Sequence, residues 1–158
     1  MQAGARALLF DRLVDLDPDT AVEPLPLRVL KRQELRESVR REVGRLLNTR
    51  CSIPAHRFDD RVRTVLDYGV PDVSSLSPQS PTDQRLLARI LSQAIETFEP
   101  RLRNVQVTAE RFVDSHKALL VRIDAQLVVE TITEPVSFPV LIRNSNGEAD
   151  VHANERAG

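Results

Sequence analysis

The sequence predicts an α+β domain in which N-terminal helices pack on one face of a small, mainly antiparallel C-terminal sheet. Two observations lead to this fold class. Apolar residues recur at helical spacing over 33–47 and 81–98, whereas over 105–113 and 119–129 they alternate with mostly polar residues. At 158 residues, the chain is long enough to bury roughly 70% of its unfolded surface in one core.

The N-terminal residues predict a short amphipathic helix on a tether. Apolar residues recur at helical spacing over 8–16, and a link with three prolines follows over 17–27. Because so short a helix is marginal in water, its apolar face needs either the parent domain or another chain. Candidate protein-contact residues on this helix are Leu9, Phe10 and Leu13.

Two longer helices follow. Over 33–47 the apolar residues form one stripe and arginines cover much of the remaining surface. The second helix is expected over 81–98, with Ser80 as its cap, Pro81 at its first position and Asp83 near its positive end. Between the helices lie a loop over 48–60, a brief apolar cluster and a turn over 68–72. The cluster contains Val62, Val65 and Leu66.

The C-terminal region predicts a hairpin and one further strand. Turn residues over 114–117 join the two alternating segments, which favours an antiparallel pair. A third strand is expected over 136–143, where Pro139 cannot donate a ladder hydrogen bond and indicates an edge or a bulge. The expected organisation is a docking helix and linker over 1–31, a folded domain over 32–143 and a disordered tail over 144–158.

The charge balance and the cysteine content limit the classes of binding partner and the cellular compartment that we expect. The 22 basic and 23 acidic side chains nearly cancel, so no net field draws the chain to nucleic acid or to an anionic membrane. Cys51 is the only cysteine, which excludes an internal disulfide and is typical of reducing compartments. No apolar run has the length of a signal peptide core or a membrane span, so we expect a cytoplasmic protein.

A search for catalytic groups finds no assembled constellation. The five glycines do not form a phosphate-binding loop, and none of the three histidines has a Cys or His partner at metal-ligand spacing. Cys51 with His56 can be read as a nucleophile and base, but a lone cysteine beside Ile53 is more often a small apolar residue. The sequence leaves the role of Cys51 open. We expect no enzymatic activity and no cofactor or metal.

One charged turn stands out after the second long helix. Pro100 lacks an amide donor and disfavours helical geometry at the preceding residue, so the helix ends near Phe98. Glu99 and Arg101 are thereby fixed between helix and sheet. The residues alone allow two interpretations, a helix terminator with two exposed charges or a protein-contact site.

Four segments together resemble the TssE subunits of bacterial type VI secretion, part of the lysozyme-like baseplate wedge family shared with contractile-tail phages. The resemblance covers about residues 8–142, in matching order. The Glu99-Pro100-Arg101 element is the family's signature and shows no departure here. The segments are Leu9 to Leu13, Ser38 to Arg50, Val65 to Asp72 and Phe98 to Leu102.

The resemblance implies a structural baseplate subunit that joins the wedge to the contractile sheath and promotes sheath assembly. The implied partners are the wedge subunits TssF and TssG, other baseplate proteins such as TssK, and the sheath subunits TssB and TssC, with the spike hub nearby. It also implies that Glu99, Pro100 and Arg101 contact other subunits.

Two other classes of function stay open. A peptidoglycan hydrolase would need a general acid and a second carboxylate across a cleft, and the nearest carboxylates are Glu96, Glu99 and Glu110. A cytoplasmic regulatory adaptor of the same fold would bind one soluble partner. A contractile sheath operon around the gene would favour the baseplate role over the adaptor.

Overall fold

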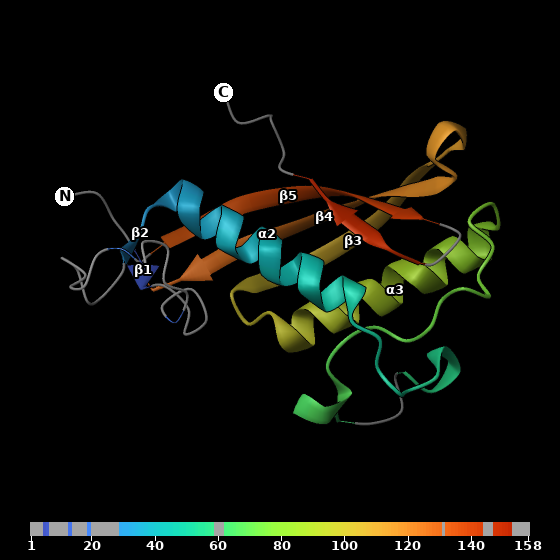
Figure 1. Cartoon of the computed structure of the whole chain (residues 1–158), viewed down its shortest axis with the longest axis horizontal. Helices are drawn as coiled ribbons and strands as arrows, with labels where there is room; N and C mark the ends of the chain where they lie inside the picture. Colours follow the sequence, from blue (N-terminus) through green and yellow to red (C-terminus); the bar gives the residue numbers. More distant parts are fainter. Residues whose placement is uncertain are drawn as a thin grey trace.

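The computed structural model describes residues 5–6, 13, 19, 29–58, 62–130, 132–143 and 147–152. Within them, two long helices precede a four-stranded antiparallel sheet (Figure 1), which confirms the predicted α+β class. The helices are α2 (Arg32–Asn48) and α3 (Pro81–Phe98). In order across the sheet, the strands are β3 (Leu102–Val113), β4 (Ala118–Val129), β5 (Ile132–Arg143) and β6 (Ala149–Val151).

The start of α3 follows the predicted local chemistry. The Oγ of Ser80 accepts a hydrogen bond from the amide of Asp83 at 3.4 Å, and Pro81 occupies the first turn of α3. At the start of α2, the amide of Lys31 donates to the carboxylate of Glu34 at 2.7 Å. Both contacts satisfy donors that a helix N-terminus otherwise leaves without an intrahelical partner.

The core lies between the helices and one face of the sheet. Even-numbered residues of β5 from Ile132 to Ile142 are buried, while the intervening residues are half-buried or exposed. Apart from Glu134, these side chains join the buried stripes of α2 and α3 in one apolar cluster. On the sheet itself, α3 packs mainly against β3 and α2 against β6. The alternation therefore gives β5 one core-facing and one outward-facing side.

The expected edge strand is wrong at its C-terminal end. There β6 continues the sheet, with Val140 opposite Val151 and Ile142 opposite Ala149. The amide of Arg143 donates to the carbonyl of Glu148 at 2.9 Å. Arg143, the last residue of β5, is therefore bonded to the segment that leads into β6 and does not lie on an open edge.

Pro135 and Pro139 fit β5 because of the direction in which their nitrogens point. The carbonyl of Pro139 accepts from the amide of His152 at 2.9 Å, so odd-numbered residues of β5 direct their backbone groups away from β4. Even-numbered residues then pair with β4. Both prolines stand at odd positions, so neither removes a bond from the β4–β5 ladder.

The tail over 144–158 was expected to be disordered, but residues 149–151 form β6. Asn48 of α2 explains why: its Oδ1 accepts from the Ala149 amide at 2.9 Å and its Nδ2 donates to the Ala149 carbonyl at 2.8 Å. This carboxamide therefore pairs with the strand as a neighbouring peptide group would. Residues 144–146 and 153–158 lie outside the described residues.

Little of the expected docking helix and linker is described. Leu9 and Phe10 lie outside the described residues, and Leu13 has a side chain that is 69% exposed. Two short strands, β1 (Ala5–Arg6) and β2 (Val29–Leu30), pair antiparallel just before α2. Among the described residues, no helix combines the length and apolar content needed to cross a membrane.

Candidate functional site

The Glu99-Pro100-Arg101 turn is built by the end of α3. Glu99 is the C-terminal cap residue, and its amide still donates to the carbonyl of Ile95 at 2.8 Å. Its own carbonyl accepts from the amide of Leu102 at 3.0 Å, which turns the chain into β3. Two charged side chains are thereby placed on either side of Pro100.

Those two side chains form a buried ion pair. Nε of Arg101 donates to Oε1 of Glu99 at 2.8 Å, and Nη2 donates to Oε2 at 2.6 Å. Glu99 is only 4% exposed and Arg101 8%. A bidentate pair of this kind satisfies both charges, which would otherwise be costly to bury.

The pair also joins elements that are distant in sequence. Nη1 of Arg101 donates to the hydroxyl of Ser38 on α2 at 3.1 Å, and Ser38 is 1% exposed. The carbonyl of Arg101 accepts from the amide of Val128 on β4 at 2.8 Å. One turn therefore holds α2, α3 and the β3–β4 hairpin together.

This geometry differs from the simple helix terminator with two exposed charges. In the chain by itself, the polar atoms of Glu99 and Arg101 are directed inward, while Pro100 is exposed. A direct contact of the two charges with another subunit stays a prediction. What the arrangement provides is a rigid base beneath the exposed Pro100.

A second turn lies against the same end of α3. It contains the short 3-10 helix η2 (Val65–Asp67), in which the carboxylate of Asp67 accepts from the amide of Thr64 at 2.9 Å and from its hydroxyl at 3.1 Å. The hydroxyl of Thr64 in turn accepts from the amide of Leu66 at 3.3 Å. Asp67 is 4% exposed, so a buried carboxylate fixes this turn.

Gly69 anchors the second turn to the end of α2. Its φ is +117°, and a Cβ there would lie 2.5 Å from the carbonyl oxygen of Thr49. The same carbonyl accepts from the amide of Val70 at 2.9 Å, and the Val70 carbonyl accepts from the amide of Cys51 at 2.9 Å. Only glycine allows this close approach without strain.

The two turns meet through an aromatic pair. The rings of Tyr68 and Phe98 are 5.3 Å apart and inclined at 64°, an edge-to-face contact. Burial raises the pKa of the Tyr68 phenol, and the negative charges of Glu42 and Glu99 raise it further, against an opposing effect of Arg45. Tyr68 therefore lies beside both the buried pair and η2.

The hollow around Cys51 offers weaker support for chemistry. Cys51 and His56 both line an open depression of about 690 Å³, including the solvent at its mouth. The thiol of Cys51 donates to the carbonyl of Ile53 at 3.8 Å, a local contact that a small buried residue would make. In the described part of the chain, no group of three His, Cys, Asp or Glu residues is placed to hold a metal ion.

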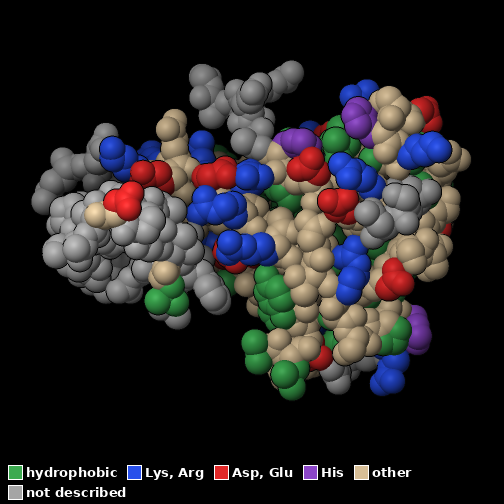
Figure 2. Space-filling model, in the orientation of Figure 1, with side chains coloured by type: hydrophobic (Ala, Val, Ile, Leu, Met, Phe, Trp, Pro, Cys, Tyr) green, Lys and Arg blue, Asp and Glu red, His purple; other side chains and the backbone are tan. Residues whose placement is uncertain are grey.

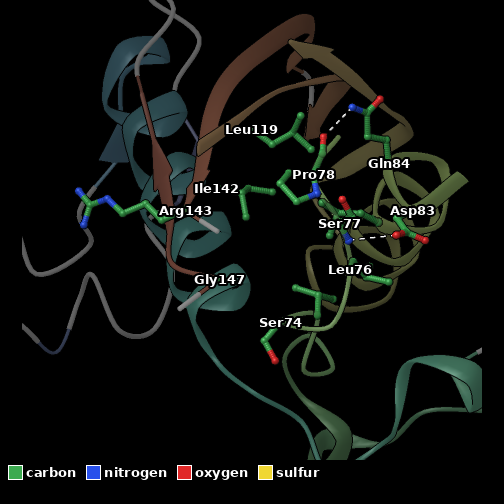
Figure 3. A pocket seen from close by; sticks show the side chains of 12 residues that line it. Ser74, Leu76, Ser77, Pro78, Asp83, Gln84, Leu119, Ile142, Arg143 and Gly147 are labelled. Carbon is green, nitrogen blue, oxygen red and sulfur yellow. Dashed lines mark hydrogen bonds between the residues drawn. The ribbon is translucent and has the colours of Figure 1, made fainter. Parts of the chain in front are cut away.

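A second hollow lies between the loop after Val73, the start of α3 and the end of β5 (Figure 3). It measures about 380 Å³, including open solvent. Two of its polar groups hold the loop against α3: the amide of Ser77 donates to Asp83 at 3.0 Å, and Nε2 of Gln84 donates to the Pro78 carbonyl at 2.8 Å. These bonds indicate a packing feature, with Leu119 and Ile142 as its apolar floor.

Sequence reasoning missed Ser38 as the third member of the buried site. A serine among arginines on a helix gives no signal of burial, and its partner lies 63 residues away.

The sequence shows Val62, Val65 and Leu66 as an apolar cluster, but it does not show that their side chains are exposed. These side chains are 93%, 83% and 88% exposed.

The fold and the buried ion pair together define a small α+β domain whose most distinctive polar group serves to join structural elements. Residues 33–131 match the family described as baseplate wedge protein gp25, and the chain belongs to this family. A structural role in a baseplate follows.

Solved structures include a similar chain, described as "The baseplate complex from the type VI secretion system". The two chains are 22% identical with a TM-score of 0.48, and the match covers 70% of this chain and 96% of that chain. The search of curated proteins gave no match.

Proposed function

We propose that this chain is a cytoplasmic structural subunit of a type VI secretion baseplate that joins the wedge to the contractile sheath and promotes sheath assembly. Membership of the baseplate wedge family, over residues 33–131, is the observation that carries the proposal. The TssE-like segments described above supply the type VI assignment. In this role the chain has no catalytic function.

The proposed partners fall into two groups. The wedge subunits TssF and TssG, with TssK nearby, would contact the end of the molecule that holds the two turns. The sheath subunits TssB and TssC would contact the sheet. A deletion strain tests this division of roles: baseplate foci should form poorly without the chain, and fluorescent sheath should rarely polymerise.

For the sheath contact, β3 is a better candidate than the β5 edge. On β5, Pro135 and Pro139 remove two of the outward donors, a common protection of sheet edges. On β3, Gln106 lies opposite Asp124 and Thr108 opposite Arg122. Because even-numbered residues of β4 direct their backbone groups toward β3, the ladder uses Gln106 and Thr108 and leaves the groups of Val107 and Ala109 directed outward.

Strand addition at β3 would use those outward backbone groups. Val107→Pro removes one outward donor while leaving the β3–β4 ladder in place, so sheath polymerisation from the baseplate should fall. Thr133→Pro is the matched control, since Thr133 is exposed on the open part of β5. Val107→Ala separates loss of the donor from loss of the side chain.

The frequency of fluorescent sheath assembly, at equal protein levels, measures the effect. If sheath assembles at normal frequency with Val107→Pro but at reduced frequency with Thr133→Pro, the sheath contact lies on β5 and not on β3. Equal, normal assembly in both variants would indicate that the sheath contact depends on side-chain packing.

The hydrolase alternative has a direct test. Glu99 is bound to Arg101 and buried, which removes it as an accessible acid. Purified chain should therefore not clear peptidoglycan. Turnover that is abolished by replacing Glu96 or Glu110 would contradict the structural assignment.

A further inference from the structure

We propose that Val65 and Leu66, named here the η2 ridge, insert into an apolar pocket with a basic rim on a wedge subunit. This inference rests on the function proposed above and identifies the surface that meets the wedge. Tyr68, which follows η2 in the chain, packs against Phe98 at the end of α3.

The first argument is exposure. Val65 and Leu66 are 83% and 88% exposed, although most other large aliphatic side chains of the described domain contribute to the core or pack against it. Figure 2 shows hydrophobic side chains gathered at the lower margin of the molecule, where η2 lies in Figure 1. Clustered aliphatic exposure of this kind is typical of protein contact sites.

The second argument is rigidity. The Thr64 and Asp67 side chains close the turn on both sides of the ridge, and the bonds of Val70 with Thr49 and Cys51 attach it to the end of α2. A preformed ridge loses little conformational freedom on binding. Its aliphatic side chains are therefore presented before the partner arrives.

The charge beside the ridge indicates the chemistry of the partner. The C-terminal end of a helix carries a partial negative charge, and the last turn of α3 contains no basic residue that would offset it. The end of α3 therefore forms a negative border. Glu96 is exposed one turn from Gln93, the residue through which α3 contacts Arg63 of the loop.

The arginines described near this helix end have contacts within the chain. Arg63 is directed inward, with its Cζ 3.2 Å from the centre of the Phe58 ring and Nη2 donating to the Phe58 carbonyl. Arg45 forms an ion pair with Glu42, and Arg101 with Glu99. Lys or Arg side chains around the receiving pocket would complement this border.

The shape of the ridge selects the kind of surface. Two adjacent aliphatic side chains on a 3-10 turn are convex, so the complement is a pocket on a folded subunit. An extended peptide would instead need a groove or an open sheet edge. Nucleic acid is disfavoured because the ridge itself offers no cation to phosphate.

The test measures binding of the full-length chain to the purified TssF–TssG complex of the same host. Leu66→Ala should weaken binding by about tenfold or more, and Leu66→Asp by more than that, because the side chain is buried only in the complex. Thr108→Asp, an equally new charge on an exposed residue of β3, should leave the affinity unchanged. Glu96→Lys should weaken binding by up to about fivefold, with less effect at high salt.

The outcomes separate this inference from the proposed function. If wild type binds the complex and Leu66→Asp binds equally well, the η2 ridge is not the contact and the baseplate role stands. If wild type does not bind at all, the wedge assignment itself fails. Unchanged or tighter binding by Glu96→Lys would contradict the basic rim.

Discussion

Two neighbouring turns of this protein treat polar and apolar groups in opposite ways. The turn after α3 buries a glutamate and an arginine, whereas the turn at η2 buries an aspartate and exposes a valine and a leucine. They are joined by the contact of Tyr68 with Phe98. In both, buried charged groups fix the backbone by hydrogen bonds. Buried charged groups therefore maintain the shape of this end of the domain, while two aliphatic side chains of η2 stay exposed.

The largest effect is expected from breaking the buried pair. Arg101→Ala leaves Glu99 charged and buried without its partner, so the free energy of unfolding should fall by about 3–5 kcal/mol. Chemical denaturation of the purified chain measures this loss. The double variant Glu99→Leu with Arg101→Met should recover much of it. A single variant as stable as wild type would show that the pair does not hold the elements together.

The anchor of the second turn should give the next effect. Gly69→Ala places a Cβ against the Thr49 carbonyl at a positive φ, so we expect a loss of about 1–3 kcal/mol in unfolding free energy. The matched control is Gly44→Ala, whose Cβ would meet only the Val151 side chain at 3.8 Å. Equal stability of the two variants would contradict the close approach.

A smaller effect is expected on the pKa of Tyr68, the residue that connects the two turns. Tyr68 is the only tyrosine and the chain has no tryptophan, so absorbance titration follows this phenol alone. Its pKa should lie above the ordinary value of about 10. Glu42→Gln should lower that pKa while leaving the burial contribution in place. An ordinary pKa in wild type would place Tyr68 outside the buried environment.

The sign of the linked stability follows from this shift. A phenol whose pKa is raised by folding ionises more readily in the unfolded chain. Its contribution is therefore fully present below the ordinary pKa of about 10 and is lost as the pH rises toward the folded value.

The smallest effect is expected on the exposed side of the comparison. Leu66→Asp should change the free energy of unfolding by no more than about 0.5 kcal/mol, because the side chain is already in water. Thermal unfolding of this variant beside Thr108→Asp provides the measurement. A loss of several kcal/mol would mean that Leu66 stabilises the isolated domain.

The order of local elements could be predicted from the sequence. Stripes at helical spacing located α2 and α3, the Ser80 and Pro81 cap placed the start of α3, and Pro100 placed its end. Alternating residues located β3 and β4. These features depend on contacts within a few residues, so the sequence alone carries them.

Contacts between distant residues had to be read from the tertiary structure. Ser38 meets Arg101 across 63 positions, and Arg36 pairs with Glu134 at 2.8 Å across 98. The short strand β6 forms because Asn48 and β5 hydrogen-bond to its backbone. The residue pattern of the tail does not predict these bonds, because the partners lie elsewhere in the chain. The charge of Glu99 and Arg101 was determined by the sequence. Their burial, and the exposure of Val65 and Leu66, was decided by tertiary packing, because hydrophobicity alone does not say which surface the fold covers.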